Sequence, residues 1–246
     1  MLRKSVWVLA LLCPLAQAGE LTVSAASSLS EAFKEVATAY EARTPGDKVL
    51  LNFAASGALL QQMAKGAPVD VFASADEQTM QLAISQGLVK AGAAKDFAGN
   101  LLVLVVPPAA KVMPKQLTDL NGATIQKLAL GNPDSVPAGR YAQQALQQAN
   151  LWSILQPRLI PAQNVRQALD YVARGEVDAG FVYQTDALQF KDKVKVAFTV
   201  PLAKPVRYPL AALAASTHPA EAQRFVRFVL SAEGQAILRR HGFQQP

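Results

Sequence analysis

Cysteine is almost absent from this sequence of 246 residues. The one cysteine, Cys13, lies among the first 18 residues, and Leu12 precedes it where a lipid-attachment signal wants a small side chain. We therefore expect Cys13 to be removed with a leader peptide rather than lipidated. A mature chain without a thiol has no disulfide, no thiolate metal ligand and no cysteine nucleophile.

Histidine is nearly as scarce, which argues against an enzyme. The two histidines, His218 and His241, lie near the C-terminus, and the sequence contains no Gly-x-Ser-x-Gly segment. An exported hydrolase that used Ser28 or Ser56 as nucleophile would lack the base that activates the hydroxyl. A transition-metal site would lack its usual ligands. We expect neither catalysis nor a cofactor.

The sequence has no apolar run of the roughly 20 residues that a membrane-spanning helix needs. The apolar run at residues 6–12 is shorter, follows Arg3 and Lys4, and is followed by Ala-Gln-Ala at 16–18. This order is typical of a cleavable secretory signal. We expect cleavage after Ala18 and a periplasmic protein that is not embedded in the membrane.

Runs of basic residues are also missing. The formal net charge is +6, and subtracting Arg3 and Lys4 of the leader leaves +4 on the mature chain. These charges are spread along the sequence without interleaved aromatics, which excludes a nucleic-acid footprint. A mild positive balance can help to attract anions, although it is more often only a solubility feature.

Short apolar runs alternate with longer amphipathic ones, which predicts an α/β fold. The expected strands are 21–26, 49–53, 69–74, 101–106, 128–131, 179–183, 194–200 and 208–215. The expected helices are 29–43, 58–65, 77–86, 140–149, 165–174 and 220–230. Such alternation favours mainly parallel sheets flanked by helices.

Two breaks in this rhythm divide the chain into lobes. Gly99-Asn100 introduces an apolar strand that ends at Pro107-Pro108, and a second break covers 201–209. After the leader, 1–18, we predict an outer lobe of 19–98 plus 203–246 and an inner lobe of 99–202. Two crossings make a hinge, and a ligand then binds in the cleft between the lobes.

Two segments of the outer lobe place serine at a strand-to-helix junction. In the first, 25–31, Ser28 and Glu31 have the spacing of a capping box. In the second, 53–59, Ser56 is the expected helix cap, and Gly57 allows close approach to the backbone.

Three segments of the inner lobe resemble them. The loop 131–140 ends in small residues where a helix begins, Asn164 precedes Gln167 at capping distance, and the strand 180–183 ends in Tyr183. Taken singly, each junction is typically a helix cap. Together they place several free N–H groups and helix dipoles at one edge of the sheets, where such groups favour an anion.

These segments, in this order, resemble the periplasmic molybdate-binding proteins of ABC-type importers. The resemblance runs from Leu21 to Phe243. Its most specific pieces are Ala-Ala-Ser-Ser-Leu at 25–29, Gly-Ala-Pro-Val-Asp-Val-Phe-Ala-Ser-Ala-Asp at 66–76, Val-Pro-Ala-Gly-Arg-Tyr-Ala at 136–142 and Pro-Ala-Gln-Asn-Val-Arg at 161–166.

The resemblance implies a type II two-lobed binding protein that closes on molybdate or tungstate. Matched by motif, the ligand-binding groups are the hydroxyls of Ser28, Ser56 and Tyr183 and the backbone amides of Ala138 and Val165. They contact oxygens of the oxyanion and do not coordinate a metal cation. The implied partners are the importer's permease and ATPase, and we expect a monomer.

Two positions depart from the family pattern. The turn at 131–135 reads Gly-Asn-Pro-Asp-Ser where many relatives have Gly-Asp-Pro, and Gly57 stands where hydroxylated residues are common. Neither departure removes a donor carried over by the resemblance, since the amide at 57 persists.

Other ligands and other classes of protein remain open. Sulfate has the same charge and shape as molybdate, so cavity size alone separates them. Phosphate often keeps a proton and wants a carboxylate acceptor; we interpret Asp70 and Asp76, the nearest candidates, as structural groups. A purely structural or adhesive secreted domain is a third possibility. We predict that molybdate and tungstate bind at least about a hundredfold more tightly than sulfate, a free-energy difference of about 2.7 kcal/mol.

Overall fold

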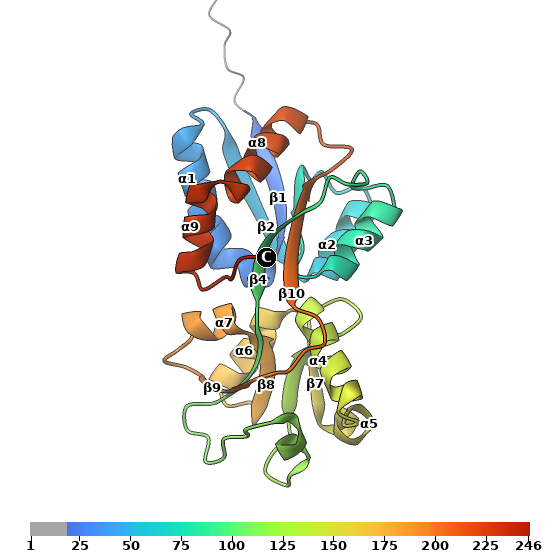
Figure 1. Ribbon diagram of the computed structural model, residues 1–246, viewed down its shortest axis with the longest axis vertical. Helices are drawn as coiled ribbons and strands as arrows, with labels where there is room; N and C mark the ends of the chain where they lie inside the picture. The colour runs from blue at the N-terminus through green and yellow to red at the C-terminus, as the bar shows by residue number, and fades with distance from the viewer. Residues whose placement is uncertain (1–18) are drawn as a thin grey trace, which may run out of the picture.

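The computed structural model describes residues 19–246 (Figure 1). The predicted leader, with Cys13, lies outside the described residues. Within the described part of the chain, no helix combines the length and the apolar character needed to cross a membrane.

The first lobe is built on a five-stranded sheet in the order β2-β1-β3-β10-β4. Its strands are β1 (Glu20–Ala26), β2 (Lys48–Ala54), β3 (Val71–Ala73), β4 (Lys95–Asn100) and β10 (Val206–Ala212). β1 pairs in parallel with β2 and β3, so these three strands end at the same edge of the sheet. The helices that follow them therefore begin along that edge.

The second lobe repeats this plan with a sheet in the order β7-β6-β8-β5-β9. Its strands are β5 (Leu102–Val106), β6 (Leu128–Gly131), β7 (Leu159–Ala162), β8 (Ala179–Tyr183) and β9 (Lys195–Thr199). β5 and β8 are buried along their whole length, as expected for central strands covered on both faces. β6 is parallel to β7 and β8.

Helices flank both sheets (Figure 1). In the first lobe they are η1 (Ser27–Leu29), α1 (Ser30–Arg43), α2 (Ser56–Ala64), α3 (Glu77–Ser85), α8 (Pro219–Leu230) and α9 (Ala232–Arg240). In the second lobe they are η2 (Leu117–Asn121), α4 (Pro137–Gln148), α5 (Trp152–Leu155), η3 (Gln156–Arg158), α6 (Val165–Ala173) and α7 (Gln184–Gln189). α1, α8 and α9 gather on one side of the first sheet, and α2 and α3 lie on the other.

The predicted α/β two-lobed fold is confirmed, with one difference in the sheets. Each sheet is mixed rather than mainly parallel, because β10 runs antiparallel to β3 and β4, and β5 runs antiparallel to β8 and β9. Among the described residues, every antiparallel pair of strands includes β5 or β10. These two strands carry the chain away from the connections between the lobes, and they enter each sheet against the direction of its βα units.

The two connections lie side by side in the middle of the molecule (Figure 1). The chain leaves the first sheet at Asn100, enters the second at Leu102, and returns between Thr199 and Val206. The sequence did not indicate β4, the strand that ends in Gly99 and Asn100 just before the apolar strand β5. The boundaries drawn at 98/99 and 202/203 stay a prediction.

Candidate anion-binding site

The five residues singled out from the sequence meet in one small pocket between the lobes. The lobes lie nearly closed on it, and its cavity volume is about 10 Å³. The residues that line it are Ala26, Ser27, Ser28, Ala55, Ser56, Ala75, Val136, Pro137, Ala138, Val165 and Tyr183. The first lobe supplies the residues up to Ala75 and the second lobe supplies the rest, so the pocket exists only when the lobes are together.

Ser28 and Ser56 both reach the pocket from the first lobe, but neither acts as a helix cap. Ser28 lies in η1 and is buried; its Oγ is 3.0 Å from the hydroxyl of Tyr208 and makes no capping bond. The predicted capping box with Glu31 is therefore wrong. Ser56 is the first residue of α2, after Ala55, and not its cap.

The hydroxyl of Ser56 is engaged by the neighbouring strand end. The backbone N–H of Ala75 donates to Ser56 Oγ at 3.0 Å, and Ser56 is fully buried. Tertiary contacts thus take both hydroxyls away from their own helix starts. Because a hydroxyl that accepts one hydrogen bond still has its own proton, Ser56 keeps a donor for the pocket.

The second lobe presents backbone amides. α4 begins with Pro137, which has no N–H, so Ala138 supplies the first amide of that helix. α6 begins at Val165 after the cap Asn164, whose side chain accepts from Gln167 N at 3.0 Å. The predicted Asn164 cap is confirmed. Amides in a first helical turn have no partner within the helix, which leaves both of them to the pocket.

Tyr183 completes the lining from the end of β8. Its hydroxyl donates to the carbonyl of Ala75 across the lobe interface at 3.2 Å. Burial, chiefly, raises the pKa of Tyr183 well above its ordinary value, so the phenol stays protonated and neutral. An anion placed in the pocket would compete with the Ala75 carbonyl for this proton.

No ionised side chain belongs to the described residues that line this pocket. Arg166, next to Val165, has its Nε 3.0 Å from Oδ1 of the buried Asp186. Burial raises the pKa of Asp186 to about 6, and the nearby Arg166 opposes that rise. The pocket therefore depends on neutral donors, and the starts of α1, α2, α4 and α6 contribute their dipoles.

A second set of contacts holds the lobes together beside the pocket. Arg140 of α4 contacts Asp76, the cap of α3, with its Nε at 2.9 Å and its Nη2 at 2.8 Å from Oδ2. The same Nη2 donates to Thr79 Oγ1 at 2.7 Å. Both charged side chains are largely buried, at 13% and 5% exposure. We call Arg140, Asp76 and Thr79 the interlobe latch.

The two departures from the family pattern face each other across the same interface. Gly57 N donates to the carbonyl of Ser135 at 2.9 Å, so the amide at 57 is used by the protein itself. A Cβ at position 57 would lie 2.7 Å from that oxygen and 2.8 Å from the Ser135 Cα. The glycine thus admits the close approach of the Ser135 turn.

Sequence reasoning missed several residues that support the site. Ala75 hydrogen-bonds to both Ser56 and Tyr183. It lies in the 66–76 motif, which could have marked it as part of the site. Tyr208 and Arg140 reach the site from elements distant in sequence, and no local pattern marks them. Asp76 proves structural, as interpreted, because its side chain also accepts from Thr79 N at 3.1 Å.

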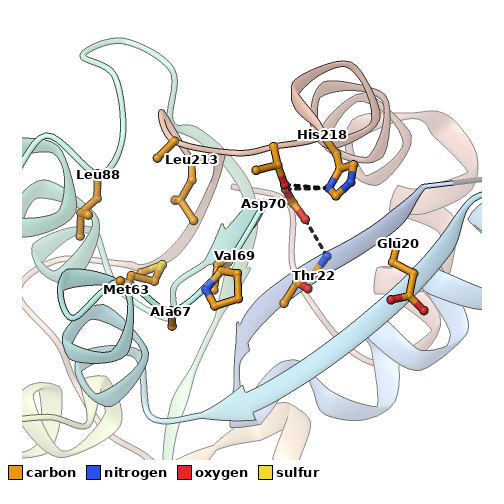
Figure 2. A pocket seen from close by; sticks show the side chains of 13 residues that line it. Glu20, Thr22, Met63, Ala67, Val69, Asp70, Leu88, Leu213 and His218 are labelled. Carbon is orange, nitrogen blue, oxygen red and sulfur yellow. Dashed lines mark hydrogen bonds and ion pairs between the residues drawn. The ribbon is translucent and has the colours of Figure 1, made fainter.

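A larger hollow at the other end of the first lobe has the wrong chemistry for an anion (Figure 2). It is lined by Met63, Val69, Leu88 and Leu213 on one side and by Glu20, Asp70 and His218 on the other. Asp70 accepts from Thr22 N at 2.9 Å and from Ser216 Oγ at 2.6 Å, which makes it structural.

Neither histidine lines the pocket. His218 Nδ1 lies 3.4 Å from Asp70, and His241 Nε2 lies 2.7 Å from Glu35 of α1. Among the residues from 19 onward, no group of three or more His, Cys, Asp or Glu side chains is arranged to hold a metal ion. The serines of the pocket therefore have no imidazole base beside them.

Comparison with known proteins shows the family of this chain. A family model described as bacterial extracellular solute-binding protein matches residues 21–244. The chain belongs to this family. Other bacterial extracellular solute-binding proteins similar to it include the molybdate-binding protein ModA of Escherichia coli K12, 37% identical over 93% of this chain and 90% of the relative. The resemblance stated from the sequence is confirmed.

Solved structures of this class have the same fold. The periplasmic molybdate-binding protein of Azotobacter vinelandii matches with a TM-score of 0.82 and 27% identity, over 92% of this chain and 99% of that chain. The sulfate-binding protein SubI of Mycobacterium tuberculosis matches with a TM-score of 0.83 at 19% identity, over 92% and 86%. The second likeness concerns the fold alone.

Proposed function

We propose that this protein captures molybdate, and tungstate with it, in the periplasm and delivers it to the permease and ATPase of an ABC importer. The observation that carries the proposal is a pocket lined by neutral donors from both lobes, with no ionised side chain in its lining. The relatives named as molybdate-binding proteins support the choice of anion. In this proposal the mature chain is an exported monomer without catalytic activity.

The donors are sufficient for useful affinity. A hydrogen bond to a charged partner contributes about 1.5 to 3 kcal/mol, so five of them give a gross gain of about 8 to 15 kcal/mol before the costs of association. Micromolar binding requires about 8 kcal/mol. Because the described residues that line the pocket include no cation, departure of the anion leaves no unpaired positive charge among its donors, which favours release.

The chemistry of the lining separates the candidate anions. A doubly charged anion without protons can accept from every donor, whereas a protonated phosphate needs an acceptor for its own O–H. The described residues that line the pocket include no carboxylate, and Asp76 is held by the interlobe latch. Sulfate is the second candidate, and its smaller size would leave some donors beyond hydrogen-bonding distance.

Calorimetric titration of the mature chain, residues 19–246, tests the proposal. We expect molybdate to bind one per chain and at least about a hundredfold more tightly than sulfate. Equal affinities for the two anions would contradict the choice of molybdate, and no binding of either would contradict the function.

Two serine variants test the site. Ser28→Ala and Ser56→Ala should each weaken molybdate binding by about 1.5 to 3 kcal/mol, the free energy of a charged hydrogen bond. Ser85→Ala, which alters an exposed serine at the end of α3 in the same lobe, is the matched control. Unchanged affinity in both pocket variants would place the binding site elsewhere.

A further inference from the structure

Tyr208 is a buried residue that contacts two members of the pocket without lining it. Its hydroxyl lies 3.0 Å from Ser28 Oγ, and its ring packs edge-on against Tyr183 with centroids 5.6 Å apart. It is fully buried and comes from β10, directly after the second connection between the lobes. Phe97 and Phe243 also pack edge-on against its ring and fix its position.

The side-chain amide of Asn100 determines which way the Tyr208 hydroxyl points. The backbone N–H of Leu101 donates to Asn100 Oδ1 at 2.9 Å, and since an N–H can only donate, the oxygen of the amide must face it. The NH₂ group then faces Tyr208 OH at 3.3 Å and Thr185 Oγ1 at 2.9 Å. The oxygen of Tyr208 is therefore an acceptor toward Asn100.

A count of protons follows from this arrangement. Tyr208 has one hydroxyl proton, and its remaining hydrogen-bond contact among the described residues is Ser28 Oγ. Burial raises the pKa of Tyr208 well above its ordinary value, so that proton is retained. If Tyr208 donates to Ser28, the Ser28 proton is free to point into the pocket.

We propose that Tyr208 and Asn100 are positioning residues that orient the Ser28 hydroxyl as a donor to the bound oxyanion. This inference rests on the proposed function. Without the incoming bond from Tyr208, Ser28 can rotate and turn its lone pairs toward the anion, which is repulsive. Asn100 fixes the direction of the chain of hydrogen bonds because its NH₂ group cannot accept.

The hydroxyl of Ser56 is oriented in the same way, but by a backbone donor. The backbone N–H of Ala75, which can only donate, is bonded to Ser56 Oγ at 3.0 Å. Both pocket serines thus accept one hydrogen bond from a fixed protein donor and keep their own proton for the ligand. At Ser28 the fixed donor is a side-chain hydroxyl, which a single substitution removes.

The experiment is a double-mutant cycle on molybdate affinity with Tyr208→Phe and Ser28→Ala. Tyr208→Phe should weaken binding about tenfold, the effect of one charged hydrogen bond at the low end of its range. Added to Ser28→Ala, it should weaken binding by less than about twofold, because a residue that acts through Ser28 has nothing left to orient. Loss of packing alone would lower affinity in both backgrounds.

Tyr40→Phe is the matched control. Tyr40 is another buried tyrosine of the first lobe, its hydroxyl donates to Asp47 Oδ2 at 2.6 Å, and its ring packs against Phe225. Its removal should leave molybdate affinity within about twofold of the unmodified protein. Melting temperatures of both variants measure any shared effect on stability.

A Tyr208→Phe affinity within about twofold of the unmodified protein, or losses that multiply in the double variant, would overturn the role of Tyr208. If Tyr208→Phe does not fold, Asn100→Ala takes its place in the same cycle and the same criteria apply. Failure of the unmodified protein to bind molybdate would instead overturn the proposed function, and with it this role.

Discussion

Replacing Asp76 by asparagine should weaken ligand binding, although the change removes a negative charge beside an anion site. Asp76 has two tasks, capping α3 and accepting from Arg140 across the lobe interface. Asparagine caps helices about as well as aspartate, so α3 should persist. What is lost is the charged half of the interlobe latch.

The size of the effect follows from the geometry of the latch. Two guanidinium nitrogens lie 2.8 and 2.9 Å from one carboxylate oxygen, and both side chains are largely buried, so solvent screens them little. Loss of one charged hydrogen bond here costs about 1.5 to 3 kcal/mol. That shifts the ratio of closed to open molecules about 10- to 150-fold, and the apparent Kd rises as the closed fraction falls.

A purely electrostatic role would give the opposite sign. If Arg140 acted only by attracting the anion, neutralising Asp76 would leave more uncompensated positive charge and would raise the affinity. Arg140→Lys separates the roles further, because lysine keeps the charge but loses the planar fork that meets Asp76 and Thr79 together. We expect this variant to bind more weakly as well.

The assay is calorimetric titration of molybdate into Asp76→Asn, Arg140→Lys and the unmodified protein at one salt concentration. Asp192→Asn, which removes an exposed charge from the second lobe, is the control and should bind normally. Tighter binding by Asp76→Asn would refute the latch. Weaker binding with an unchanged melting temperature of the ligand-free protein would support it.

Three further predictions concern the backbone, the interface and pH. Val165→Pro removes the amide N–H at the first position of α6, where proline fits a helix, and the extended backbone of Asn164 accepts a following proline. Molybdate binding should weaken by about 1.5 to 3 kcal/mol, measured by calorimetry. Unchanged affinity would show that this amide does not bind the anion. Gly57→Ala should lower affinity but not the unfolding free energy of the ligand-free protein, because its Cβ meets Ser135 only across closed lobes; normal affinity would contradict this. Burial raises the pKa of Asp186 from 3.8 to about 6, so between these values the folded state holds a proton that the unfolded state lacks, and the contribution of Asp186 to stability should fall as pH rises from about 4 to about 6. In urea unfolding, the free energy of unfolding of Asp186→Asn should therefore rise relative to that of the unmodified protein over this range. A difference between the two free energies that does not change with pH would contradict the shift.

Much of the site was accessible from the sequence because it is built from local signals. Asn164 caps α6 as its spacing with Gln167 indicates. The helix predicted at 140–149 is present as α4, but it begins earlier, at Pro137, because the small residues assigned to the preceding loop form its first turn, where proline is favoured. The family resemblance then selected five positions from a larger number of helix starts, and the structure brings all five into one pocket.

Long-range contacts were not accessible in this way. Ser28 has the spacing of a capping box with Glu31, yet its hydroxyl is taken by Tyr208, 180 residues away. A sequence pattern shows only the backbone groups near a hydroxyl in the chain. In the folded state the Ser28 hydroxyl bonds instead to a buried side chain from another strand. The 66–76 motif drew attention to Ala75, but no local pattern showed that its N–H donates to Ser56.

Secondary structure was missed where the local signal was short or contradictory. β7 contains Pro161, which is tolerated because this strand lies at the sheet edge and pairs with β6 alone. β4 includes Gly99 and Asn100, residues that ordinarily mark a turn, and it is held by β10 and by a bridge from Gly99 to Gln244. Pairing partners distant in sequence decided both strands.

The most direct test of the central claim is the position of the metal in crystals of the mature protein grown with molybdate. Anomalous scattering at the molybdenum absorption edge should give one peak per chain, inside the pocket enclosed by Ser28, Ser56, Ala138, Val165 and Tyr183. The oxygens around it should lie within about 2.7 to 3.2 Å of the five donors. A peak beside Arg140 or in the hollow of Figure 2, with the pocket empty, would contradict the account.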